Sequence, residues 1–332
     1  MEISVIATVR NEESSIGHLL DSLLSQTRLP DEVVIVDGGS TDHTVDVVRR
    51  YQSRGIPLRL QVLPGCNISE GRNAAVAAAR GPIIACTDAG VRLHSDWLAA
   101  LERALVDSSG RLKADVASGF FVPEADTVFE CAMGATVLPA LEDIRPDCFL
   151  PSSRSVAYTK LAWRTVGGYP DWLDYCEDVV FDLSLRRAGQ QFIFAPQALV
   201  SFRPRGTLRA FFKQYYLYAR GDGKAGLFAR RHLIRYSSYS LGALAMLLGI
   251  WYKVTWLLLA LAAAFYVRRP LTRLGPLAER LGRDDRVRAA AWIPIIRLTG
   301  DVAKMIGYPV GVWWRCRYGR SGGWAGGRHS QL

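Results

Sequence analysis

Four short apolar runs in the first hundred residues alternate with segments patterned for helices, and this alternation limits the possible folds most strongly. The runs are rich in β-branched residues, and the segments between them carry apolar residues at helical spacing. The expected strands are 3–8, 32–37, 58–63 and 82–90, and the expected helices are 14–24, 45–51, 69–81 and 95–105. Continuously apolar strands separated by helices are typical of a parallel sheet covered on both faces. We therefore expect an α/β domain.

Polar, acidic and glycine-rich residues gather just after three of these expected strands. They occupy positions 8–12, 37–40 and 87–90. Ligands on open parallel sheets bind beyond the carboxyl ends of the strands. The sequence therefore predicts a binding site at this edge of the sheet.

The pattern is looser from residue 114 to residue 226. Expected strands lie at 114–123, 152–160, 191–196 and 198–205, and an amphipathic helix begins near residue 207 and ends near Gly221. Another expected helix begins with two adjacent acids, Glu177 and Asp178. Acids in a first helical turn are stabilised by the helix dipole by only about 0.3–1 kcal/mol. The local sequence therefore leaves open whether this pair serves the helix or takes a proton in a reaction.

The C-terminal third is apolar and basic. Residues 236–267 carry one charge, Lys253, and exceed the roughly 20 apolar residues that a single membrane span needs. Arginines flank this block on both sides, so a single span would place one basic flank outside the cell, against the positive-inside rule. We therefore favour a hairpin over a single span, and we expect an interfacial helix at about 291–315.

Charge and composition narrow the class of partner. The net charge is +10, and arginines crowd the last third beside apolar stretches, which favours an anionic membrane surface over nucleic acid. No nucleic-acid-binding motif is present, and the six cysteines have no CxxC pair that would indicate a metal site or a disulfide framework. The expected organisation is a catalytic domain over 1–225 and a membrane-associated region over 226–332. The first residues lack the basic start of a signal peptide, so we expect the catalytic domain to face the cytoplasm.

Five ordered blocks resemble a family 2 glycosyltransferase with the GT-A fold, of the membrane-anchored bacterial type. The blocks are "SVIATVRNEESSIGHLLDSLLSQT", "EVVIVDGGSTDHT", "GRNAAVAAARG", "IIACTDAGVRLHSDWL" and "GGYPDWLDYCEDVVFDLSLRRAG", which together cover roughly residues 3–190. The resemblance implies a mostly parallel, Rossmann-like sheet and a nucleotide-diphosphate sugar as donor.

The resemblance also implies roles for the donor-binding residues. Thr8, Glu12 and Asp37 match positions that hold the base and ribose, and Arg72 suits the diphosphate. Asp88 matches the first acid of an Asp-x-Asp motif, which contacts ribose or a divalent cation, Mg²⁺ or Mn²⁺. The second acid of that motif is replaced by Gly90, and hard cations prefer several oxygen ligands, so metal dependence stays open.

In inverting members of the family, an Asp of an acidic pair deprotonates the acceptor hydroxyl, which assigns the base role to Asp178 here. Glu177 is then the neighbour that shapes the pKa of Asp178 or binds the acceptor. The four further candidates for phosphate or acceptor contacts are Arg203, Arg205, Gln214 and Arg220. An amphipathic helix lying on the membrane explains the residues around 214–220 equally well.

The resemblance leads us to expect an inverting transferase that moves a sugar to a lipid-linked or other membrane-proximal hydroxyl. Its expected partners are the nucleotide sugar, a lipid or glycan acceptor and membrane lipids, with no nucleic acid. A nucleotidyltransferase on a similar sheet would need a glycine-rich phosphate loop, and the segment after the first strand has no glycine before Gly17. A catalytically silent membrane scaffold that binds nucleotide sugars or partner enzymes remains the alternative.

Overall fold

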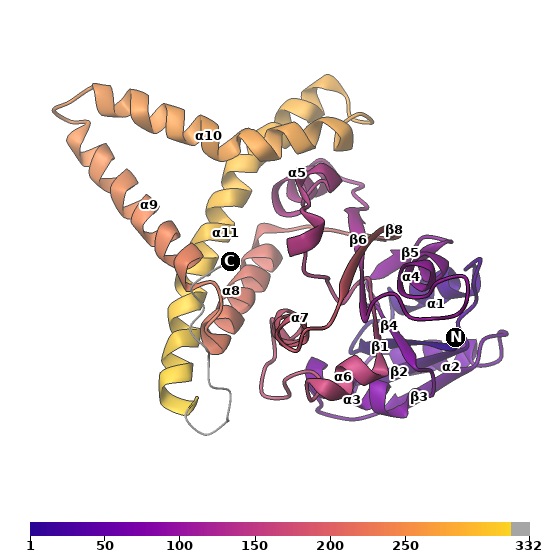
Figure 1. Cartoon of the computed structure of the whole chain (residues 1–332). Helices are drawn as coiled ribbons and strands as arrows, with labels where there is room; N and C mark the ends of the chain where they lie inside the picture. The colour runs from indigo at the N-terminus through magenta and orange to yellow at the C-terminus, as the bar shows by residue number, and fades with distance from the viewer. Residues whose placement is uncertain (320–332) are drawn as a thin grey trace. The chain divides into compact units, whose positions relative to one another are not determined.

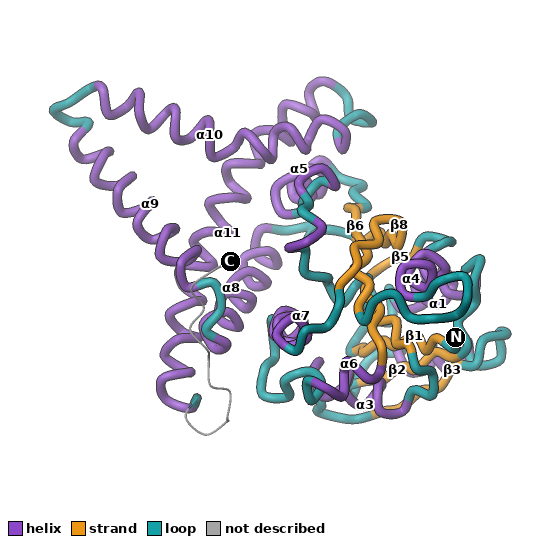
Figure 2. The backbone as a smooth tube through the Cα atoms, in the orientation of Figure 1, coloured by secondary structure: helices purple, strands orange, loops and turns teal. Residues whose placement is uncertain are grey.

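The computed structural model describes residues 1–319, and these form two compact units. The sheet unit comprises residues 1–124 and 141–203, and the helical unit comprises residues 125–140 and the chain from residue 204 onward. Every strand belongs to the sheet unit (Figure 2). The predicted boundary at residue 225 falls inside the helical unit, and residues 320–332 of the predicted C-terminal region lie outside the described residues.

The sheet has eight strands in the order β3-β2-β1-β4-β7-β6-β8-β5. Strands β1 to β4 pair in parallel, whereas β7 runs antiparallel to both β4 and β6, β8 is parallel to β6 and β5 is antiparallel to β8. The strands are β1 (Ile3–Val9), β2 (Glu32–Asp37), β3 (Leu58–Val62), β4 (Ile83–Cys86), β5 (Val91–Leu93), β6 (Val116–Pro123), β7 (Val156–Thr159) and β8 (Phe192–Phe202).

Helices cover both faces of this sheet, as the continuously apolar strands predict. Successive residues of a strand point to opposite faces, so Val5 joins the core under α1, α2 and α4, while Ile6 joins the core under α3, α6 and α7. Figure 1 shows α1 and α4 on the opposite side of the sheet from α3 and α6. These helices are α1 (Ile16–Leu24), α2 (Thr44–Tyr51), α3 (Ile68–Ala78), α4 (Trp97–Leu105), α6 (Lys160–Thr165) and α7 (Glu177–Arg187).

Three elements differ from the sequence expectations. The strand expected over 82–90 ends at Cys86, and β5 follows it separately. The two short strands expected around residue 197 are one strand, β8. Its register with β6 jumps from Ser118–Phe194 to Phe120–Leu199, so an irregular segment interrupts the pairing there. Helix α5 (Val128–Val137) was not expected.

The helical unit contains α5, α8 (Leu208–Ala225), α9 (Ala229–Leu248), α10 (Val254–Leu277) and α11 (Arg283–Tyr318). Helix α8 runs past the expected end at Gly221 and stops at Gly226, whose φ of +70° suits a helix C-terminus. Helices α8 and α11 pack through glycine: side-chain atoms at Gly307 and Gly311 would collide with the backbone of α8. The expected interfacial helix at 291–315 is therefore part of a longer helix with one face buried against α8.

Helices α9 and α10 meet at the turn 249–253, which contains Lys253, and then diverge (Figure 1). Both are tied to α11 through the carboxylate of Asp301. This carboxylate accepts hydrogen bonds from Arg235 Nε at 2.8 Å, Tyr239 Oη at 3.1 Å and Tyr266 Oη at 2.6 Å. Asp301, predicted to belong to an interfacial helix, thus joins three helices.

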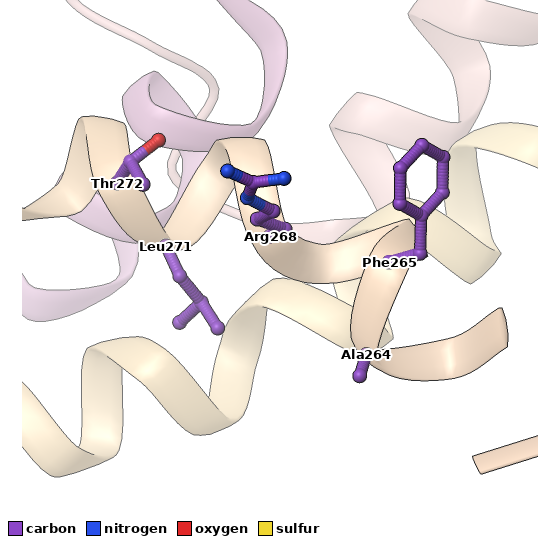
Figure 3. A pocket seen from close by; sticks show the side chains of 5 residues that line it. All are labelled: Ala264, Phe265, Arg268, Leu271 and Thr272. Carbon is purple, nitrogen blue, oxygen red and sulfur yellow. The ribbon is translucent and has the colours of Figure 1, made fainter. Parts of the chain in front are cut away.

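The surface of α9 and α10 is strongly apolar. By length and composition, α10 is the one helix within residues 1–319 that could cross a membrane, with a mean hydropathy of 1.3 in its most apolar window. Large apolar side chains such as Trp251, Leu257 and Phe265 are more than half exposed. Figure 3 shows a shallow hollow on α10 where Phe265, Leu271 and the cation of Arg268 lie along one stretch of the helix.

Replacing Gly311 with alanine is expected to destabilise the helical unit by about 1–3 kcal/mol, because the added methyl group would overpack α8 against α11. The matched control is Gly242→Ala in α9, since a Cβ at Gly242 meets no described atom within 4 Å. Alanine there should stabilise the helix by up to about 1 kcal/mol. Thermal unfolding of the detergent-solubilised protein would measure both effects, and equal melting temperatures for the two variants would contradict the glycine contact.

Candidate active site

A buried arginine joins three elements of the sheet unit. Arg72, in the first half of α3, is 3% exposed, and its two terminal nitrogens bind two carboxylates. Nη1 donates to Glu177 Oε1 at the start of α7, and Nη2 donates to Asp88 Oδ1, 3.0 Å away, just beyond β4. A buried charge is costly unless it is paired and hydrogen-bonded, so Arg72 fixes the positions of both acids.

The acidic pair occupies the first turn of α7. Cys176 precedes it with φ +65°, a left-handed conformation that costs a non-glycine residue roughly 1–2 kcal/mol. Glu177 is buried against Arg72, whereas Asp178 is half-buried. Burial raises the pKa of Glu177, Arg72 opposes this rise, and the neighbouring Asp178 carboxylate adds to it. The two acids of the pair therefore differ in environment: one is held by a cation, and the other keeps contact with solvent.

A third acid lies one helical turn beyond Asp178. Asp182 is 3% exposed, and its Oδ2 has no hydrogen-bond partner among the described residues. Burial, reinforced by the charge of Asp178, raises the pKa of Asp182 well above its ordinary value. Sequence analysis did not single out Asp182, although its spacing of four from Asp178 places both on one side of α7.

The three expected base and ribose contacts lie at the carboxyl ends of β1 and β2, where the sheet topology places a ligand. Thr8 is half-buried, and its Oγ1 has no hydrogen-bond partner within the described chain. Glu12, by contrast, accepts a hydrogen bond from the Ser15 hydroxyl. Thr8 thus has an unused donor and acceptor at the strand end.

The Asp37 carboxylate is fully buried at the end of β2, where it holds the following turn. It accepts hydrogen bonds from the amides of Gly39 at 2.9 Å and Ser40 at 2.8 Å, and from the Ser40 hydroxyl. A carboxylate has about four acceptor sites, and these three hydrogen bonds use most of them. Asp37 therefore shapes the turn in addition to any contact with a ligand.

The strand pairing brings a residue that sequence analysis missed to Asp88. Strands β4 and β7 are antiparallel, and Cys86 pairs with Val156. Continuing this register by two residues places Arg154 opposite Asp88, and Arg154 Nε lies 4.0 Å from Asp88 Oδ2. To predict that Arg154 lies beside Asp88, one must know which strand pairs with β4 and in which register, and the sequence alone reveals neither.

The residues around Asp88 do not fit the divalent cation that the family resemblance implies. Asp88 presents one oxygen to Arg72 and the other to Arg154, and Gly90 supplies no second carboxylate. Within residues 1–319 no group of three or more His, Cys, Asp or Glu side chains is arranged to hold a metal ion. A cation bound at Asp88 would lie next to two guanidinium charges, with no carboxylate at position 90 to offset them.

The four remaining candidates stay predictions. Arg203 is exposed just after β8, and Arg205 is exposed in the segment that leads to α8. Gln214 and Arg220 lie within α8, where Gln214 Nε2 donates to Tyr218 Oη at 2.8 Å.

Replacing Asp182 with asparagine is expected to stabilise the protein increasingly as the pH rises. Because the folded-state pKa of Asp182 is raised, the folded chain binds more protons than the unfolded chain above pH 3.8, and the free energy of unfolding falls with rising pH. The slope is at most about 1.4 kcal/mol per pH unit, and asparagine removes it. Thermal unfolding at pH 5, 6.5 and 8 would test this. The exposed Asp46→Asn is the control, and a pH-independent difference from the parent protein would refute the assignment.

Comparisons with known proteins agree on the family. The model described as glycosyl transferase family 2 matches residues 4–130. The glycosyltransferase AglE of Haloferax volcanii is 29% identical over 220 residues, covering 62% of this chain and 69% of AglE. The validoxylamine A glucosyltransferase of Streptomyces hygroscopicus subsp. limoneus is 37% identical over 92 residues, covering 27% of this chain and 20% of that protein. For that glucosyltransferase and two further curated relatives, the matched region spans only about a third or less of the relative's own length.

Solved structures share the fold. A mannosyltransferase from Pyrobaculum calidifontis, in complex with GDP-Man and Mn²⁺, superposes with a TM-score of 0.54 at 17% identity, covering 96% of this chain and 88% of that one. TarS 1-349 of S. aureus, in complex with UDP-GlcNAc, gives a TM-score of 0.50 at 17% identity, covering 96% and 92%. The GT-A fold expected from the sequence is confirmed. Residues 4–130 of the chain are therefore similar to glycosyl transferase family 2.

Proposed function

We propose that this chain transfers a sugar from a nucleotide-diphosphate sugar to a hydroxyl group of an acceptor at the membrane, with inversion at the anomeric carbon. The observation that carries the proposal is the asymmetry of the acidic pair. Glu177 is buried and ion-paired with Arg72, whereas Asp178, its neighbour, is half-buried and accessible to a substrate. A general base must reach the proton that it removes, and Asp178 is the member of the pair able to do so.

The donor side of the proposal rests on the strand ends. Thr8 has unused hydrogen-bonding capacity, and the half-buried Glu12 and Asp88 carry carboxylates that would accept hydrogen bonds from a base or from ribose hydroxyls. Asp37 holds the turn beside them. The fold neighbours were solved with GDP-Man and with UDP-GlcNAc, which supports a nucleotide sugar as donor class without choosing the nucleotide.

In the proposed reaction, Asp178 takes the proton of the acceptor hydroxyl while the hydroxyl oxygen attacks the anomeric carbon. The bond between that carbon and the diphosphate oxygen breaks, and the electron pair leaves with the nucleoside diphosphate. Arg72 holds Glu177 and Asp88 in place, so the start of α7 stays fixed beside the strand ends.

The acceptor side of the proposal rests on α9 and α10. Their exposed apolar side chains and the arginines in the second half of α10, such as Arg268 and Arg269, suit an anionic bilayer surface. Basic flanks on both sides of the pair favour an orientation with the sheet unit in the cytoplasm. An enzyme held at the bilayer would meet a lipid-linked acceptor there.

Replacing Asp178 with asparagine should lower transfer by roughly 10²- to 10⁴-fold, because the amide cannot accept the proton. Nucleotide binding should be preserved, since the carboxylate is not a proposed donor contact. The measurement is nucleotide release from UDP-, GDP- and dTDP-sugars by protein in native-like membranes, with Asp46→Asn as the surface control. Donor binding with equal background release from the parent protein and Asp178→Asn would instead support the catalytically silent scaffold.

Replacing Leu257 and Leu261 together with aspartate should move the protein from the membrane fraction to the soluble fraction. Both side chains lie on one face of α10 and are about 60% exposed. Each aspartate near the centre of a membrane helix costs about 2.5–3.5 kcal/mol. The control is Leu161→Asp in α6 of the sheet unit, where leucine is 72% exposed. An unchanged membrane fraction for the double variant would show that α10 does not enter the bilayer.

A further inference from the structure

The electrostatic surroundings of Asp88 suggest how the donor diphosphate is neutralised. Its two carboxylate oxygens face Arg72 at 3.0 Å and Arg154 at 4.0 Å. Arg72 is also committed to Glu177 and is almost fully buried. The Arg154 side chain is 25% exposed, so of these two guanidinium groups it is the one with solvent access.

Arg154 is held in place by its neighbours. Its Nη1 lies 3.1 Å from Ser152 Oγ, and its guanidinium lies over the Phe202 ring, 4.6 Å from the ring centre. The Thr87 hydroxyl donates to the Arg154 carbonyl at 3.0 Å, which fixes the backbone of residue 154 beside the end of β4. A planar guanidinium held in this way can bind two phosphate oxygens at once with little loss of side-chain freedom.

We propose that Arg154 takes the electrostatic role that a divalent cation has in metal-dependent relatives, so that the donor diphosphate binds to the Arg154 guanidinium and needs no metal. This inference rests on the proposed transferase function and deepens it. Arg154 exchanges no proton: the proton passes to Asp178, and the leaving diphosphate keeps the electron pair next to the guanidinium. Arg72 serves as the internal positioning cation that holds Asp88 and Glu177.

Gly90 offers a converse test of this proposal. A Cβ built on Gly90 meets no described atom within 4 Å, and the residue does not have a positive φ. Aspartate therefore fits at position 90 and would restore the second acid beside Asp88. Combined with removal of the Arg154 charge, this substitution should convert the site to one that binds Mn²⁺.

The experiment is calorimetric titration of the full-length protein in nanodiscs with UDP, GDP and dTDP, in EDTA or in Mn²⁺. The parent protein should bind one of the nucleotides with an affinity that changes less than about 3-fold between the two conditions. Arg154→Gln should weaken this binding by roughly 10- to 100-fold, the effect expected for a charge-assisted hydrogen bond. Arg164→Gln, an exposed arginine on α6, is the matched control and should bind as the parent does.

A second variant, expected to gain Mn²⁺-dependent binding, keeps the test valid even if Arg154→Gln fails to fold. The double variant Gly90→Asp, Arg154→Ala should regain nucleotide binding only with Mn²⁺, and electron paramagnetic resonance should detect Mn²⁺ binding that the parent protein lacks. Parent binding that requires Mn²⁺ and ignores Arg154→Gln would overturn the proposal and leave the transferase intact. Parent protein that binds none of the three nucleotides in either condition would overturn both the proposal and the proposed function.

Discussion

The arrangement of the site depends on one buried cation. Arg72 links α3 to the end of β4 through Asp88 and to the start of α7 through Glu177. Removing one partner of a buried ion pair typically costs 3–5 kcal/mol, because the remaining charge is left uncompensated. The same constraint separates the two acids of the pair. Glu177 neutralises Arg72 and is fixed, whereas Asp178 is not bound to Arg72 and is the one proposed to act as the base. The acids at the start of α7 are thus more than favourable partners of a helix dipole.

Much of the sheet unit could be predicted from local sequence. The strand at 32–37 was predicted to the residue, because its β-branched run is buried on both faces and ends at a glycine-rich turn. The helix led by Glu177 was expected from its acidic start and basic end, and the structure bears this out. The same local signals placed Asp37 and Asp88 at strand ends. Here each residue's local pattern and its place in the sheet agree.

Features set by distant pairing could not be predicted. Arg154 reaches Asp88 only because β7 inserts antiparallel beside β4, and no local pattern reveals the partner of a strand. Helix α5 carries Ala132, Met133 and Gly134 buried all round, so it has no polar face whose spacing would mark a helix. Asp301 lies in the stretch for which an interfacial helix was expected, and only the tertiary structure shows that its carboxylate accepts hydrogen bonds from Arg235 and from two tyrosines of neighbouring helices.

The register between β4 and β7 has a consequence for how such sites diverge. Positions 88 and 154 lie opposite each other just beyond the paired ends of β4 and β7, and position 90 follows position 88 in the same segment after β4. The positive charge that would neutralise a diphosphate here can therefore come from a cation held at positions 88 and 90 or from an arginine at position 154, with the same backbone. With the role proposed for Arg154, a gain of arginine at position 154 would compensate for the loss of an acid at position 90. In an alignment of relatives, we expect these two positions to vary together.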